Sequence, residues 1–118
     1  MMNVVSMIFS VAAALEHIYI LYLETIITES EKTSKVFNIE INELRRKTVS
    51  TLLKNQGVYN GLLSILLFIS IFRYELFWIR LILSYIILVA IYGGITSNLK
   101  IIFKQGGLAI IALLCSFY

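Results

Sequence analysis

The feature that most constrains this chain is a series of long apolar segments joined by polar connections. A helix needs ~20 mostly apolar residues to cross the ~30 Å hydrocarbon core of a bilayer. We predict four such spans, at about residues 4–28, 57–72, 77–96 and 101–118. They use most of the 118 residues, 59% of which are hydrophobic. We therefore expect an all-α chain in which residues 1–118 form a single integral membrane domain, a bundle of four transmembrane helices.

The basic residues predict how the chain is oriented. Lys and Arg are enriched in the cytoplasmic loops of membrane proteins. Of the ten in this chain, all except Arg73 and Arg80 lie in the connection 29–56, or in and just beyond the connection before the fourth span. This asymmetry predicts a multi-pass protein with both termini outside the cell and the loop 29–56 in the cytoplasm.

The end of this loop has its own pattern. Between Ile41 and Leu53, apolar side chains recur at helical spacing and charged side chains occupy the opposite face. We predict an amphipathic cytoplasmic helix that runs into the second span. Its basic residues would lie near anionic lipid head groups, although the rule that loops are positive inside explains them equally well.

Polar side chains interrupt the apolar segments. An ionisable group at the centre of a span costs at least ~2.5–3.5 kcal/mol, so such residues mark functional sites. Because successive spans alternate in direction, all of these side chains are predicted to converge in the cytoplasmic half of the membrane. The candidate ligand-binding or proton-handling residues are Glu16, His17, Glu24, Asn55, Gln56, Tyr59, Asn60, Tyr92, Thr96 and Gln105.

Helical spacing places Glu16, His17 and Glu24 on one face of the first span, which we expect to point into the bundle. In the second span, Gly57 and Gly61 are four residues apart, a small-xxx-small pattern that permits close approach of another helix. The predicted polar site therefore lies beside a predicted helix contact.

The polar residues of this cluster suit more than one role. A low dielectric disfavours the charged forms of carboxyl and imidazole groups, so His17 with Glu16 or Glu24 is a candidate proton-handling pair. The competing interpretation is a hydrogen-bonded structural network, since polar side chains commonly join membrane helices. A metal site is not predicted, because the Glu-x-x-His spacing of di-iron bundles is missing. No cofactor motif is found, and the basic residues flank spans rather than form a nucleic-acid surface.

Several segments carry a family resemblance. They are Ala14–Glu24, Lys35–Phe37, Asn55–Gly61, Ile91–Thr96 and Gln105-Gly106. Together they resemble the small bacterial four-helix membrane proteins of the family called domain of unknown function 1304. The resemblance implies an integral protein of the bacterial cell membrane and implies no established reaction. Family members often have Pro shortly after the Gln-Gly of the last span, where this chain has Gly107-Leu108.

The functional prediction is a small polytopic membrane protein that binds a lipid, an amphipathic small molecule or a partner protein in membrane homeostasis. Membrane lipids and a second copy of the chain are the expected partners. The alternatives are a proton-coupled small-molecule transporter and a membrane enzyme that uses Glu/His acid–base chemistry on a lipid-soluble substrate. A polar site that ends blindly in the inner half favours binding or catalysis, whereas a path to both membrane faces favours transport.

Overall fold

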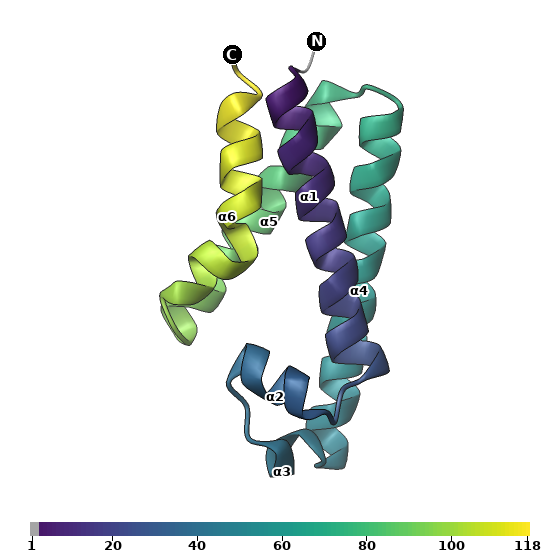
Figure 1. Cartoon of the computed structure of the whole chain (residues 1–118), viewed down its shortest axis with the longest axis vertical. Helices are drawn as coiled ribbons and strands as arrows, with labels where there is room; N and C mark the ends of the chain where they lie inside the picture. Colours follow the sequence, from purple (N-terminus) through teal and green to yellow (C-terminus); the bar gives the residue numbers. More distant parts are fainter. Residues whose placement is uncertain (1–2) are drawn as a thin grey trace. The chain divides into compact units, whose positions relative to one another are not determined.

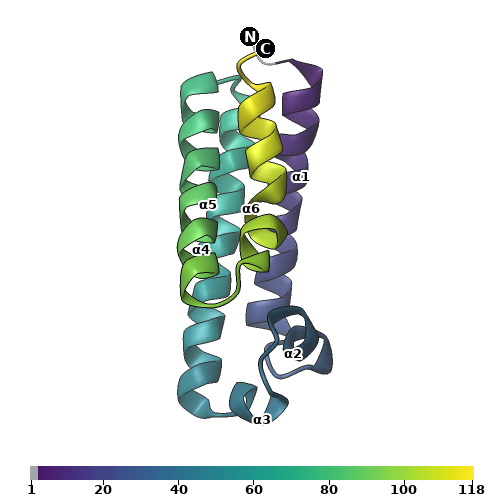
Figure 2. The ribbon, with the colours of Figure 1, turned by 90° about the vertical axis from the view of Figure 1, so that its left-hand side faces the viewer.

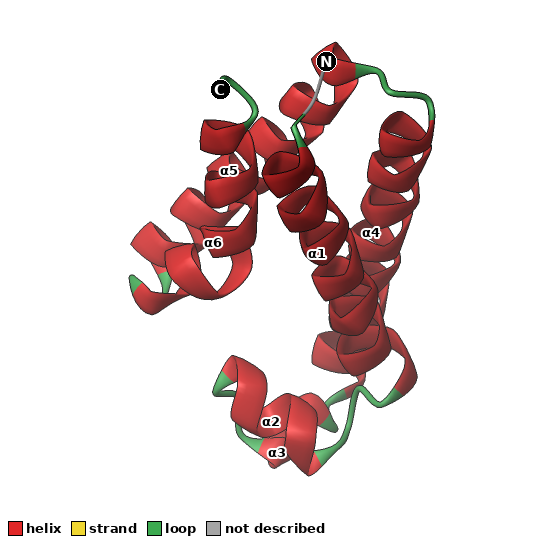
Figure 3. Cartoon of the chain, turned by 45° about the horizontal axis from the view of Figure 1, so that its top comes forward, coloured by secondary structure: helices red, strands yellow, loops and turns green. Residues whose placement is uncertain are grey.

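The computed structural model describes residues 3–118, and its regular structure in that range is entirely helical (Figure 3). The expectation of an all-α chain is confirmed. In chain order the elements are α1 (Val4–Leu21), the π-helical turn η1 (Tyr22–Ile26), α2 (Glu31–Phe37), α3 (Ile41–Leu44), α4 (Lys47–Phe72), α5 (Leu76–Thr96) and α6 (Lys100–Cys115).

Three stretches of helix are long and apolar enough to cross a membrane: Val4–Ile26, Lys47–Phe72 and Leu76–Thr96. The helix α6, at the position of the fourth predicted span, has 16 residues. At 1.5 Å per residue it is about 24 Å long, which is shorter than the ~30 Å hydrocarbon core. The prediction of four spans is therefore not confirmed. Three candidate spans are consistent with a membrane protein.

The chain divides into two compact units, one of Met1–Glu16 with Ser64–Tyr118 and the other of His17–Leu63. The helices α1 and α4 each contribute to both units. The assignment of residues 1–118 to a single membrane domain stays a prediction.

In the first unit, α5 and α6 pack side by side as an antiparallel pair (Figure 2). Glycine makes this contact close. A Cβ atom on Gly94 would overlap the side chain of Ile102, and one on Gly106 would lie 3.0 Å from Ala90 Cβ. Small residues at helix contacts are typical of membrane proteins.

The beginning of α1 lies beside the end of α6 in the same unit (Figure 1). The hydroxyl of Ser6 donates to the carbonyl oxygen of Ala112 at 2.7 Å. On α5, the Arg80 guanidinium donates to the Ser116 hydroxyl at 3.1 Å and to its carbonyl oxygen at 2.7 Å. The Arg80 guanidinium also lies 4.1 Å from the centre of the Phe117 ring. These contacts hold the C-terminal end of α6.

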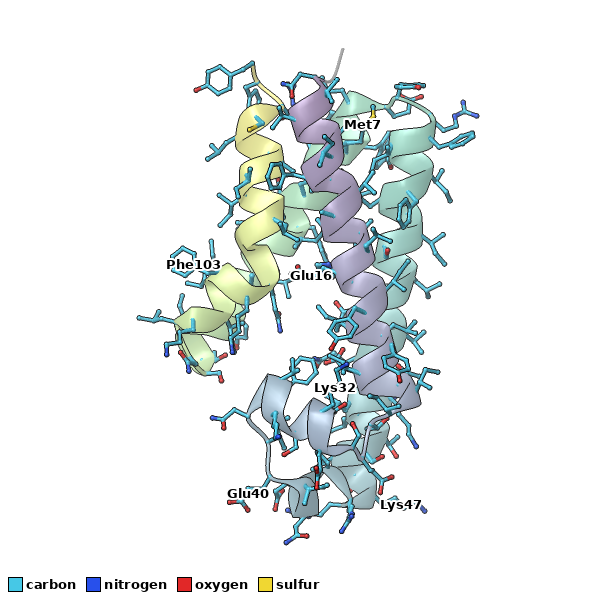
Figure 4. The ribbon with its side chains drawn as sticks, in the orientation of Figure 1. Met7, Glu16, Lys32, Glu40, Lys47 and Phe103 are labelled. Atoms are coloured by element: carbon cyan, nitrogen blue, oxygen red, sulfur yellow. The ribbon has the colours of Figure 1, made fainter. Side chains whose placement is uncertain are left out.

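In the second unit, α2 and α3 follow η1 (Figure 1). The helix α2 begins at a Ser30 cap, whose hydroxyl accepts from the Thr33 N–H at 3.1 Å. It ends at Asn38, which has a left-handed φ of 55°, a conformation that Asn tolerates. Lys32 lies on α2 (Figure 4). Its ammonium nitrogen is 5.4 Å from the centre of the Tyr19 ring. The helix α2 is thus tied to α1 within this unit.

The predicted amphipathic helix from Ile41 to Leu53 is present but interrupted. The helix α3 ends at Leu44, and α4 begins at Lys47 and continues without a break into the predicted second span. The Arg46 carbonyl oxygen already accepts from the Ser50 N–H at 2.8 Å, so a new helix starts there. Hydropathy locates only the apolar part of α4, because polar residues such as Lys54 continue the helix without disrupting it.

Candidate functional site

The Glu24 carboxyl group is the centre of the candidate site. This residue is completely buried. Gln56 Nε2 donates to one carboxyl oxygen of Glu24 at 2.6 Å, and Asn60 Nδ2 donates to the other at 2.9 Å. We call these three residues the Glu24 cluster. All of them were candidates from the sequence, and they come from two helical segments that are distant in the chain.

Glu24 lies in the middle of the π-helical turn η1. Such turns account for well under 1% of residues and occur frequently at functional sites. The wider turn pairs the Ile27 N–H with the Tyr22 carbonyl oxygen at 3.0 Å. The backbone of Glu24 itself accepts from the Thr28 hydroxyl at 2.6 Å. The backbone therefore departs from α-helical geometry at Glu24, the residue with the buried carboxyl group.

The helix α2, which follows η1 in the chain, stabilises this turn through Thr33. Thr33 is completely buried, and its hydroxyl lies 2.8 Å from the Leu23 carbonyl oxygen and 2.9 Å from that of Ile27. Backbone carbonyl groups at a helix end need such partners when they are buried. Thr33 thus supplies a hydrogen bond where the helical pattern ends.

Glycine brings α4 close to η1. A Cβ atom on Gly57 would overlap the Thr25 hydroxyl and would lie 3.0 Å from Glu24 Cβ. A Cβ atom on Gly61 would overlap the side chain of Leu21. The Thr25 hydroxyl also donates to the Lys54 carbonyl oxygen at 2.8 Å. The close approach predicted from the Gly57–Gly61 spacing is therefore present in the structure.

The orientation of the Asn60 amide is fixed by two bonds. One N–H of its Nδ2 group points to Glu24, and Nδ2 also donates to the Gln56 carbonyl oxygen of its own helix at 3.1 Å. Rotating the amide by half a turn would place Oδ1 against two acceptor oxygens. Asn60 therefore presents both N–H groups to the protein, and its oxygen is left for other partners.

Three further candidates lie in the same unit. His17 is buried, with 4% of its surface exposed. Asn55 and Tyr59 are exposed on α4, and Tyr59 exposes 77% of its surface. The structure therefore joins Glu24 to two of the four polar side chains predicted on this helix.

The remaining candidates lie in the other unit. Glu16 is half-buried on α1 (Figure 4), and its Oε1 atom is buried without a hydrogen-bond partner in the described part of the chain. Tyr92 and Thr96 are exposed on α5, and the Thr96 hydroxyl donates to the Tyr92 carbonyl oxygen at 3.0 Å. Gln105 is half-buried on α6. Convergence of all the polar residues in one site stays a prediction.

Three threonines near the cluster were not among the candidate site residues from the sequence: Thr25, Thr28 and Thr33. All three follow Glu24 in the sequence, and their hydroxyl groups bond backbone carbonyl oxygens. A run of threonines at the polar end of a span is the signal that could have identified them. Among residues 3–118, no group of three or more His, Cys, Asp or Glu side chains could hold a metal ion.

Comparison with known proteins identifies the family of this chain. The profile of a family described as "Protein of unknown function (DUF1304)" matches residues 11–117. The chain is similar to the "Uncharacterized protein YpaA" of Lactococcus lactis subsp. lactis (strain IL1403), with 54% identity over 99% of this chain and 100% of the relative. No solved structure matches the chain. The extent of the profile match and the identity to the bacterial relative show that this chain belongs to the DUF1304 family.

Proposed function

We propose that this protein binds an amphipathic molecule in the membrane and holds the polar end of that molecule at the Glu24 cluster. The observation that carries the proposal is the complete burial of the Glu24 carboxyl group in a helix long enough to cross a membrane. An ionisable residue at such a position is by default a functional-site hypothesis. The π-helical turn at the same residue supports it independently.

The surroundings of the cluster suit an amphipathic ligand. Glu24 is buried, Asn60 is half-buried and Gln56 is exposed, so the cluster extends from the interior to the surface of its unit. On α4, Leu52 lies one turn before Gln56 and Tyr59 one turn after it, and they expose 63% and 77% of their surfaces. They offer apolar and aromatic contact area for the apolar part of a ligand, next to a polar anchor.

The competing interpretation is a structural network. Side-chain hydrogen bonds between membrane helices contribute only ~0.6 kcal/mol each on average, and Gly57 and Gly61 already bring the two segments together. Helix association alone therefore gives little reason to bury a carboxyl group. The hypotheses of proton-coupled transport and of acid–base catalysis stay predictions from the sequence.

Native mass spectrometry of the protein, extracted with its membrane lipids, tests the proposal. We expect the wild type to retain a bound molecule and Glu24→Gln to retain much less of it. Glu31→Gln is the matched control, because it makes the same chemical change at an exposed position of α2. If Glu24→Gln does not fold, Gln56→Leu replaces it, since Gln56 is exposed. Equal retention in all variants, or retention in none, would overturn the proposal.

A further inference from the structure

We propose that the ligand's polar end is a hydrogen-bond donor, a hydroxyl or ammonium group, and that the amide oxygens of Asn60 and Gln56 accept from it. This inference rests on the proposed function and names the chemical class of ligand. It follows from which hydrogen-bonding atoms of the Glu24 cluster are already used and which remain.

The N–H groups of the cluster point mainly inward. Both N–H groups of Asn60 are used, one by Glu24 and one by the Gln56 carbonyl oxygen. Gln56 uses one of its two N–H groups on Glu24. Among residues 3–118, neither Asn60 Oδ1 nor Gln56 Oε1 accepts a hydrogen bond. An amide oxygen has two lone pairs, so the cluster offers mostly acceptors to a ligand.

The buried carboxyl group strengthens these acceptors. An amide that donates its N–H becomes a better acceptor at its oxygen, because hydrogen bonds in a chain polarise one another. Each amide of the cluster donates to a different carboxyl oxygen of Glu24. Hydrogen bonding to the carboxyl group therefore polarises both amides and makes Asn60 Oδ1 and Gln56 Oε1 more negative. More negative oxygens favour a hydroxyl or a cationic N–H donor as the ligand.

An anionic head group is disfavoured at the same place. A phosphate or carboxylate would need donors, and within the described part of the chain the cluster has one N–H without an acceptor, on Gln56. The nearest basic residue along α4 is Lys54, two positions before Gln56. At ~100° per residue its side chain leaves the helix about 200° away, on the opposite side. Lys54 therefore offers no cation to an anionic group at Gln56, which favours a donor over phosphate there.

Three amphiphiles with one chain length test this selectivity: dodecanol, dodecylammonium and dodecyl phosphate. Each is titrated at equal mole fraction into nanodiscs of phosphatidylcholine that contain the full-length protein labelled with ¹⁵N in its Asn and Gln side chains. The side-chain amide signals of Asn60 and Gln56 report binding at the cluster. Asn60→Leu removes one acceptor, and Asn42→Leu makes the same change at an exposed position of α3.

We expect the alcohol and the ammonium compound, but not the phosphate, to shift both amide signals saturably. Asn60→Leu should weaken this binding by about tenfold, the effect of ~1.4 kcal/mol, whereas Asn42→Leu should leave it unchanged. Phosphate binding as tight as that of the alcohol would overturn donor selectivity and leave ligand binding intact. Unchanged binding in Asn60→Leu would also overturn the inference. If no amphiphile shifts the amide signals, the inference and the proposed function both fail.

Discussion

Replacing Gly57 by Ala should destabilise the second unit, because η1 leaves no room for a methyl group. The new Cβ atom would overlap the Thr25 hydroxyl and lie 3.1 Å from the Thr25 backbone nitrogen. The hydroxyl can turn away only by giving up its 2.8 Å bond to the Lys54 carbonyl oxygen. The backbone nitrogen cannot turn away. The two segments must therefore separate.

The size of the effect follows from opposing contributions. Overpacking a well-packed contact costs typically ~1–3 kcal/mol, and loss of the Thr25 bond costs ~0.5–1.5 kcal/mol. Ala is favoured over Gly in a helix by ~0.8–1 kcal/mol, which offsets part of this. We expect the free energy of unfolding of Gly57→Ala to fall by roughly 1–3 kcal/mol. Separation should also lengthen the 2.6 Å bond between Gln56 and Glu24.

Gly107→Ala is the matched control. A Cβ atom at Gly107 would meet no heavy atom within 4 Å among the described residues, so this variant should keep or slightly raise the stability. Unfolding is measured in lipid–detergent micelles by raising the mole fraction of sodium dodecyl sulfate and following far-ultraviolet circular dichroism. Equal stability of Gly57→Ala and Gly107→Ala would refute a contact between α4 and η1 too close for a methyl group.

Three further substitutions test other contacts. Gly61→Ala should be destabilising because its Cβ atom would overlap the side chain of Leu21; adding Leu21→Ala should restore part of the loss, and a purely additive double variant in the same unfolding assay would contradict the contact. Thr33→Val should lower the free energy of unfolding by ~1–2 kcal/mol and speed hydrogen exchange in α2, since it removes the hydroxyl bonded to the η1 region; unchanged exchange would count against this docking. Arg80→Lys should speed carboxypeptidase trimming of the C-terminus, because an ammonium group cannot reproduce both bonds to Ser116; equal trimming rates would show that these bonds do not hold the end of α6.

The helices were largely predictable from the sequence, but their ends were not. Apolar content located the cores of α1, α4 and α5, because only a helix satisfies its own backbone in hydrocarbon. The helical segment before the second span was predicted, but its break between Leu44 and Lys47 was not, because the apolar side chains recur at helical spacing on both sides of the break. The π-helical turn at Tyr22–Ile26 was missed for a different reason. It depends on tertiary partners such as Thr33, which no local periodicity reveals.

Whether a candidate side chain joins the site depends on whether it needs a hydrogen-bond partner from another segment of the chain. A buried carboxyl group cannot be satisfied by its own helix, so Glu24 required donors, and the sequence placed Gln56 and Asn60 at a suitable depth. A hydroxyl group has a local solution in the carbonyl oxygen one turn earlier. Thr96 uses that solution, so its position in an apolar segment creates no need for a partner on another helix. The predicted contact is therefore present for Glu24, whose carboxyl group needs donors from another segment, and absent for Thr96, whose hydroxyl bonds its own helix. By the same argument Glu16, whose Oε1 atom is buried without a partner in the described part of the chain, is the candidate whose surroundings still call for a donor.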